Sequence, residues 1–300
     1  MRQRLAYFDN LKGFAILLVV LGHCIQSCGT GEHYRFLFNL IYAFHMPLFM
    51  AVSGYFGYRS GDINLLSRTK KNVVRLMVPY FAWGGLSLLL FKTSPLQLFI
   101  SPDSYLWFLW DLFFISFVVN AVLSMFGDKA KPTITIPILA VFSVIILGFG
   151  KFLPTNDFNI KSICWMFQFY VAGAAYKVYG EKLKANKFVG ILMAALFLIL
   201  FGAKYAFMPQ NGMAAYITSM VIAYLACYAC LVLFRSYADN ESPLTRLGQS
   251  TLGVYAVHQL LIKVCGIDNV WLSFAVVLFL SVSFVYVIRK TQYLKFLIGE

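Results

Sequence analysis

Long apolar runs alternate with short polar connectors along almost the whole chain. A helix of about 20 apolar residues is long enough to cross the hydrocarbon core of a bilayer. Candidate spans lie at residues 13–28, 36–57, 72–93, 105–126, 133–150, 160–179, 187–207, 213–235, 250–266 and 268–288. The connectors are rich in Gly, Pro, Asp and Ser, which are typical of turns. The pattern therefore predicts an all-α polytopic membrane bundle of about ten transmembrane helices.

The composition agrees with a membrane environment. Hydrophobic residues make up 60% of the chain, charged residues make up 12%, and the mean hydropathy is +0.74. A soluble domain is apolar over only about half of its residues. Because no polar stretch is long enough for a separate globule, the sequence predicts one membrane domain over residues 1–300, with the lipid bilayer as its solvent.

The net charge of +13 raises the question of nucleic-acid binding. In membrane proteins, however, Lys and Arg are concentrated on the cytoplasmic side. With ten helices, the segments on the N-terminal side of the membrane carry 19 Lys and Arg residues, and the opposite connectors carry 6. This asymmetry predicts that both termini are cytoplasmic, and it explains the charge without a nucleic-acid partner.

Lys12 and His23 lie on the first predicted helix, eleven residues apart. At 3.6 residues per turn, this spacing returns both side chains to nearly the same face, with a rise of roughly 16 Å between them. An ionisable side chain at membrane depth is costly and is therefore a functional candidate. The pair suits a ligand such as acyl-CoA, which has an anionic head and a distant reactive end. Alternatively, Lys12 anchors the helix end and His23 bonds a neighbouring helix.

Two further groups of polar residues lie in or beside predicted spans. His45 precedes Pro47, which lacks a backbone donor, so His45 either shapes a cavity or satisfies freed carbonyl groups. Lys71 and Arg75 are four residues apart and share one helical face, where they form a candidate phosphate site or a positive-inside anchor. The apolar residues that follow Arg75 predict that its side chain points inward.

Asp111 and Trp107 lie in the outer half of the fourth predicted span. An acid among aromatic rings can hold a sugar, although Trp is also ordinary at a membrane boundary. His258 lies near mid-depth of the ninth span. Three histidines at membrane depth raise the question of a metal, but no His-x-x-x-His or Glu-x-x-His spacing accompanies them, so we expect no metal site.

Several segments, taken in order, resemble the acyltransferase 3 family of membrane O-acyltransferases, nearest to its fucose 4-O-acetylase-like branch. The resembling segments are residues 7–23, 44–49, 53–56, 75–80, 107–109 and 248–258. In that family a basic residue and ten intervening residues precede a histidine in the first helix, and Lys12 and His23 match this pattern. Two departures stand out: many members have Arg in place of Lys12, and Asn72 stands where one of two paired arginines is often found.

The resemblance implies transfer of an acyl group, in the first place acetyl, from cytosolic acyl-CoA to a hydroxyl of a cell-envelope carbohydrate at the bacterial inner membrane. The implied site residues are His23 and His45 for catalysis, Lys12, Lys71 and Arg75 for the donor phosphates, and Asp111, Trp107 and His258 for the acceptor. Acyl-CoA is a donor substrate, and no permanently bound cofactor is expected. The question of a homo-oligomer stays open.

Two other functions stay open at this point. A proton-coupled transporter or exporter would use His23, His45 and Asp111 as a proton relay. A catalytically silent scaffold of an envelope assembly complex would show neither CoA release nor substrate flux.

Overall fold

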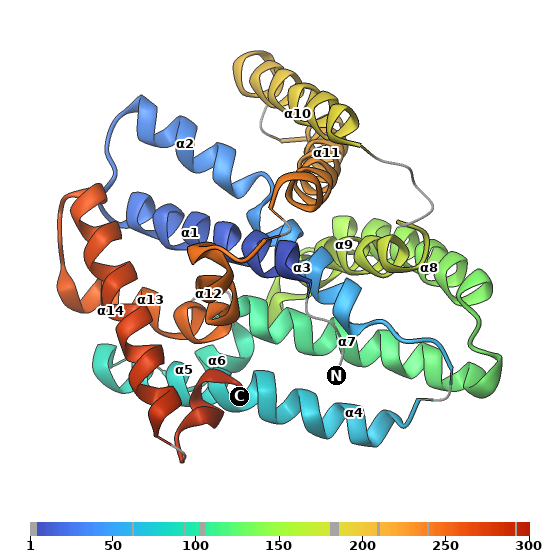
Figure 1. Ribbon diagram of the computed structural model, residues 1–300, viewed down its shortest axis with the longest axis horizontal. Helices are drawn as coiled ribbons and strands as arrows, with labels where there is room; N and C mark the ends of the chain where they lie inside the picture. The colour runs from blue at the N-terminus through green and yellow to red at the C-terminus, as the bar shows by residue number, and fades with distance from the viewer. Residues whose placement is uncertain are drawn as a thin grey trace. The chain divides into compact units, whose positions relative to one another are not determined.

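The computed structural model describes residues 5–61, 63–92, 94–101, 106–180, 186–208, 211–238, 240–291 and 293–300. Every regular element within these ranges is helical (Figure 1). The chain forms two compact units, one from Met1–Phe49 and Leu183–Ser283 and the other from Met50–Lys182 and Phe284–Glu300. Helices α3 (His45–Gly57) and α14 (Val270–Lys290) each begin in the first unit and end in the second.

Eight helical stretches among the described residues are long and apolar enough to cross a membrane. They are α1 (Ala6–Cys28), α2 with α3 (Glu32–Gly57), α4 to α5 (Leu65–Phe91), α7 (Trp107–Phe126), α8 (Pro132–Phe152), α10 (Lys187–Phe207), α11 (Met213–Tyr237) and α14. The other two predicted runs form α9 (Ile160–Tyr179) and α13 (Thr251–Cys265), which is only 15 residues long. The prediction of a polytopic helical membrane bundle is therefore confirmed, with eight clear spans in the described ranges where ten were expected.

Helix α1 is the centre of the first unit, where it packs against α2, α11, α12 (Pro243–Gln249) and α13. The short helix α12 was not predicted. It is fastened to α1 by Asn10, which is 1% exposed. The Asn10 amide donates to the carbonyls of Ala238 and Asn240 at 2.6 and 2.8 Å, and its oxygen accepts from Ser242 and Thr245 at 2.6 and 2.8 Å. All four hydrogen-bonding positions of this buried amide are thus used.

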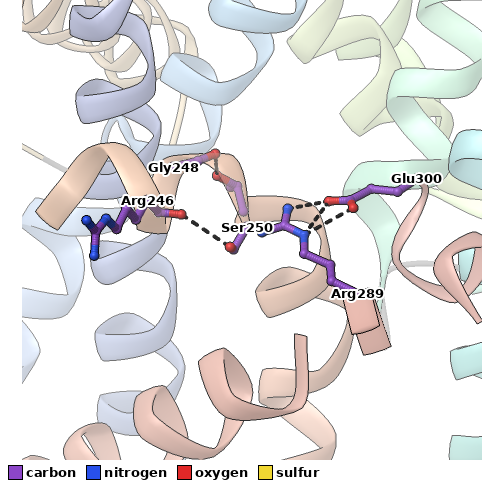
Figure 2. Close-up of polar contacts among 6 residues, drawn as sticks. Arg246, Gly248, Ser250, Arg289 and Glu300 are labelled. Atoms are coloured by element: carbon purple, nitrogen blue, oxygen red, sulfur yellow. Dashed lines mark hydrogen bonds and ion pairs between the residues drawn. The ribbon is translucent and has the colours of Figure 1, made fainter. Parts of the chain in front are cut away.

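Two glycines let α1 and α12 approach closely. A Cβ atom at Gly13 would lie 2.2 Å from the carbonyl oxygen of Leu244, and one at Gly248 would lie 1.8 Å from that of Asp9. Any larger residue at either position would push the helices apart. Directly after α12, the Ser250 hydroxyl donates to the Arg246 carbonyl at 3.2 Å (Figure 2), where the chain passes into α13.

In the second unit, α3 packs on α9 through two glycines in the same way. A Cβ at Gly54 would lie 1.9 Å from the Tyr170 carbonyl oxygen, and one at Gly173 would lie 1.7 Å from that of Ala51. Cations then satisfy the carbonyl groups left free where α3 ends. Arg68 donates to the Gly57 carbonyl at 3.3 Å, and Lys177 donates to the Tyr58 carbonyl at 2.6 Å, as expected for basic residues at a helix C-terminus.

The predicted span at residues 36–57 is not one helix. Helix α2 ends at Tyr42 and α3 begins at His45. In a continuous helix, the ring of Pro47 would clash with the carbonyl of Ala43 and leave that carbonyl without a hydrogen-bond donor. The helix is interrupted at Ala43.

The helix from α4 (Leu65–Asn72) to α5 (Val78–Phe91) contains a π-helical turn, η1 (Val73–Met77). The Val78 N–H bonds the Val73 carbonyl, five residues earlier. Pro79 has no N–H to donate to the carbonyl of Arg75, four residues earlier. The π-helical turn therefore lies where the regular α-helical hydrogen bonds cannot form.

The C-terminal residues fold back on the second unit. The Trp83 indole N–H donates to the Leu297 carbonyl at 2.7 Å, next to buried Ile298 in η5 (Lys295–Ile298). Arg289 at the end of α14 binds both carboxylate oxygens of Glu300, with Nε–O distances of 2.9 and 3.1 Å (Figure 2).

Candidate active site

Both residues of the predicted pair on the first span lie on α1. The Lys12 ammonium group forms an ion pair within this helix, because its Nζ lies 2.6 Å from Oδ1 of Asp9, three residues earlier. Asp9 is 4% exposed, so the ammonium group contributes to compensating the charge of a buried carboxylate. Binding of an acyl-CoA phosphate by Lys12 stays a prediction. The phosphate would have to share the ammonium group with Asp9.

His23 lies near the end of α1 and is half-buried. Its Nδ1 lies 3.0 Å from Oε1 of Gln26, and Nε2 of Gln259 on α13 lies 3.1 Å from both ring nitrogens. An amide oxygen only accepts hydrogen bonds, so the contact with Gln26 places the ring hydrogen on Nδ1. The Nε2 atom then has a lone pair, which accepts from the Gln259 amide. This arrangement holds a neutral imidazole whose two nitrogens both lie beside Gln259 of α13, with the lone pair on Nε2.

Tyr42, the last residue of α2, closes one side of His23. Its hydroxyl lies 3.4 Å from both Nδ1 of His23 and Oε1 of Gln26. The tyrosine ring fits against Gly22, where a Cβ would lie 2.9 Å from its Cε2 atom. The glycine before His23 therefore leaves the room that Tyr42 occupies.

His258 on α13 lies beside His23, with 5.2 Å between the ring centroids. It is fully buried, and its Nδ1 lies 2.8 Å from the Tyr255 carbonyl and 3.2 Å from the Val254 carbonyl. Two carbonyl neighbours require a hydrogen on Nδ1, which leaves a lone pair on Nε2. That Nε2 atom has no hydrogen-bond partner among the described residues.

His45 opens α3, directly after the break from α2. Its Nδ1 donates to the Ile41 carbonyl at 2.8 Å, and its ring meets Tyr42 edge-on at 4.7 Å between centroids. Of the two roles open to His45, this geometry favours satisfying a carbonyl at the break. The first unit thus gathers His23, His45 and His258, three predicted residues from separate helices, around one end of α1.

The remaining predicted residues belong to the second unit. Lys71 on α4 and Arg75 in η1 are both exposed, so the expectation that Arg75 points inward is wrong. The π-helical turn also changes the angular spacing on which the shared face of Lys71 and Arg75 depended. Phosphate binding by these two cations stays a prediction.

Asp111 is fully buried on α7, close to half-buried Trp107. Its two carboxylate oxygens accept from Asn159 Nδ2 at 2.8 Å and from the Ser162 hydroxyl at 2.6 Å. These bonds tie α7 to the start of α9. Contact of Asp111 and Trp107 with an acceptor stays a prediction.

The sequence reasoning missed Gln26, Tyr42 and Gln259. It considered only ionisable side chains, although neutral amides and phenols also need partners in an apolar bundle. Gln26 is three residues after His23, and Gln259 directly follows His258, so their spacing was a usable signal. Within the part of the chain that the structure describes, no three His, Cys, Asp or Glu side chains gather closely enough to hold a metal ion.

A neutral imidazole with a fixed hydrogen and a basic lone pair is equipped to remove a proton from a hydroxyl. The family model of an acyltransferase domain, acyltransferase 3, matches residues 5–290. The chain belongs to the acyltransferase 3 family. This confirms the resemblance, and the protein is a multi-pass membrane acyltransferase.

Two relatives of the acyltransferase are both described as nodulation protein NolL. The one from Mesorhizobium japonicum is 29% identical, over 84% of this chain and 74% of the relative. The one from Sinorhizobium fredii is 33% identical, over 41% of this chain and 38% of the relative. No solved structure matches the chain.

Proposed function

We propose that this acyltransferase moves an acetyl or similar acyl group from cytosolic acyl-CoA to a hydroxyl of a cell-envelope carbohydrate, at the bacterial inner membrane. The observation that supports this most is the arrangement of His23. Its hydrogen is held by Gln26 at 3.0 Å, and its other nitrogen is unprotonated within an apolar bundle. Such a group suits O-acyl transfer, because the acceptor hydroxyl must lose a proton as it attacks.

The reaction follows from that arrangement. The Nε2 atom of His23 takes the hydroxyl proton while the acceptor oxygen forms a bond with the thioester carbonyl carbon. The carbon–sulfur bond then breaks, the CoA thiolate takes the proton from His23, and the imidazole is neutral again. Gln26 keeps the ring in the productive tautomer throughout.

The proposed roles of the other residues divide between the two substrates. Lys12, Lys71 and Arg75 are cations suited to the phosphates of the donor. His258 is assigned to the acceptor, and contact of Asp111 and Trp107 with the acceptor stays a prediction. His45, implied as catalytic by the resemblance, bonds the backbone and supports the site from the break between α2 and α3. Acyl-CoA enters as a substrate, and no permanently bound cofactor takes part.

The test is His23→Ala in purified protein, incubated with labelled acetyl-CoA and glycan extract. We expect the rate of acyl transfer to fall by about 10² to 10⁴, the usual contribution of a general base. The matched control is His33→Ala, because His33 is exposed on α2 and contacts Tyr34 rather than the site. Full activity in a correctly folded His23→Ala protein would overturn the assignment.

A further inference from the structure

Two buried polar side-chain atoms among the described residues have no hydrogen-bond partner: Nε2 of His258 and the hydroxyl of Ser281. A serine hydroxyl can rotate toward a carbonyl of its own helix. The imidazole of His258 has no such freedom, because its Nδ1 is held by two carbonyls, at 2.8 and 3.2 Å. A buried acceptor left unpaired is costly, so His258 Nε2 points to a group that joins it during the reaction.

The chemistry of that group is restricted. Because Nδ1 carries the ring hydrogen, Nε2 has only a lone pair and must receive a hydrogen bond. The thioester carbonyl and the ionised phosphates of an acyl donor have no hydrogen to give, although the amide N–H groups of its pantetheine arm do, so the KM for acetyl-CoA is followed in the test. A hydroxyl of the acceptor has a hydrogen to give.

The position of His258 restricts the ligand further. Its ring centroid is 5.2 Å from that of His23, so a molecule at one imidazole is next to the other. The hydroxyl that bonds His258 is not the one that loses its proton to His23. Two hydroxyls on adjacent carbons of a sugar are donors close enough together to reach two neighbouring imidazoles.

We propose that the acceptor is a vicinal diol. One hydroxyl loses its proton to His23 Nε2 and is acylated, while its neighbour donates a hydrogen bond to His258 Nε2 and stays intact. The half-buried Gln259 side chain, 3.1 Å from His23 Nε2, occupies the place of the reacting hydroxyl and moves aside for it. This inference rests on the proposed function and adds the class of acceptor that His258 selects.

The experiment compares acceptors with and without the neighbouring hydroxyl. The probes are methyl glycosides of fucose, galactose and glucose, with labelled acetyl-CoA, followed by the monodeoxy derivatives of the best acceptor. A site built to bond a hydroxyl discriminates strongly against an analogue that lacks it. We expect loss of the neighbouring hydroxyl to lower kcat/KM on the order of 100-fold or more.

The same comparison is made in His258→Phe, which keeps a ring but has no acceptor nitrogen, and in His258→Gln, whose amide oxygen can accept. In His258→Phe we expect the complete acceptor to react as slowly as the deoxy acceptor, with the KM for acetyl-CoA unchanged. In His258→Gln we expect part of the preference for the diol to return. His258→Leu replaces the phenylalanine variant where thermal unfolding shows that the larger ring is not tolerated.

An unchanged preference for the diol in His258→Phe or His258→Leu would overturn the inference and leave the acyltransferase function intact. A rise in the KM for acetyl-CoA alone would also overturn it, because it would assign the bond to an N–H of the donor. If the unaltered protein acetylates none of the glycosides or glycan extracts, the proposed function fails, and this inference fails with it.

Discussion

Lys12 illustrates how a single residue can serve two purposes. Its ammonium group is 2.6 Å from the carboxylate of Asp9, which is buried where α1 meets α12. Removing one partner of a buried ion pair takes away part of the compensation of the remaining charge, which can cost more than the pair itself contributes. A change at Lys12 therefore affects folding as well as any contact with a phosphate.

We expect Lys12→Met to lower the free energy of unfolding by roughly 1–3 kcal/mol, because the buried Asp9 carboxylate loses its ion pair with Lys12. Adding Asp9→Asn removes that charge and should restore most of the stability. If Lys12 also binds the donor, the double variant will still have a raised KM for acetyl-CoA. Thermal unfolding and the KM are measured on the same preparations. A double variant with both normal stability and a normal KM would show that Lys12 has only a structural role.

The sequence predicted where residues lie along one helix, but it did not predict which helices meet. The spacing of Lys12 and His23 placed both correctly on one helix, and His258 lies beside His23. The sequence did not reveal the hydrogen-bond partners of His23, because pairing between α1 and α13 depends on tertiary packing. It also gave no sign that Arg75 is exposed, because the π-helical turn depends on how the chain relieves the constraint at Pro79.

At the level of helices, small residues define the contacts. Gly248 lies against the backbone of Asp9, where a Cβ would be only 1.8 Å from the carbonyl oxygen, so a methyl group has no room. We expect Gly248→Ala to destabilise the protein by about 1–3 kcal/mol, the usual cost of overpacking. The control is Gly202→Ala on α10, where a Cβ would meet nothing within 4 Å.

Thermal unfolding in detergent measures both glycine variants. Gly202→Ala should be as stable as the unaltered protein or slightly more stable, because alanine favours a helix. Equal stability of the two variants would contradict the close contact between α1 and α12.

The long apolar helices were predictable because length and hydropathy are properties of the local sequence. Many of their ends agree with the prediction to within a few residues, as in α10 at Lys187–Phe207. The first and third stretches begin earlier than predicted, at Ala6 rather than residue 13 and at Leu65 rather than residue 72. Helix α12 was not predictable in this way, because its seven residues resemble a polar connector. Its position depends on Asn10, more than 200 residues away, whose four hydrogen bonds no local pattern indicates.

For the whole molecule, the number of crossings determines the sides on which the termini lie. The eight clear spans among the described residues, or ten with α9 and α13, put both termini on one side, whereas nine would not. The 19 to 6 distribution of Lys and Arg predicts that this side is the cytoplasm. We expect a C-terminal green fluorescent protein fusion to fluoresce and a C-terminal alkaline phosphatase fusion to be inactive.

Phosphatase fusions after Lys92 and after Lys151, in connectors predicted to face outward, provide the matched control and should be active. An active phosphatase at the C-terminus would require an odd number of crossings. In that case α9 or α13 would be the helix that does not cross.

The break between α2 and α3 affects how any mutational survey of this protein is interpreted. The Ile41 carbonyl at that break accepts from the His45 ring at 2.8 Å and from the Phe44 N–H at 3.3 Å. Backbone groups that lack partners are poorly tolerated at membrane depth. A substitution at His45 would leave this carbonyl with the longer bond from Phe44, so a strain carrying it would lose product in part because less intact enzyme reaches the membrane. A screen that measured product alone would therefore class His45 as catalytic, although its ring hydrogen-bonds a backbone carbonyl.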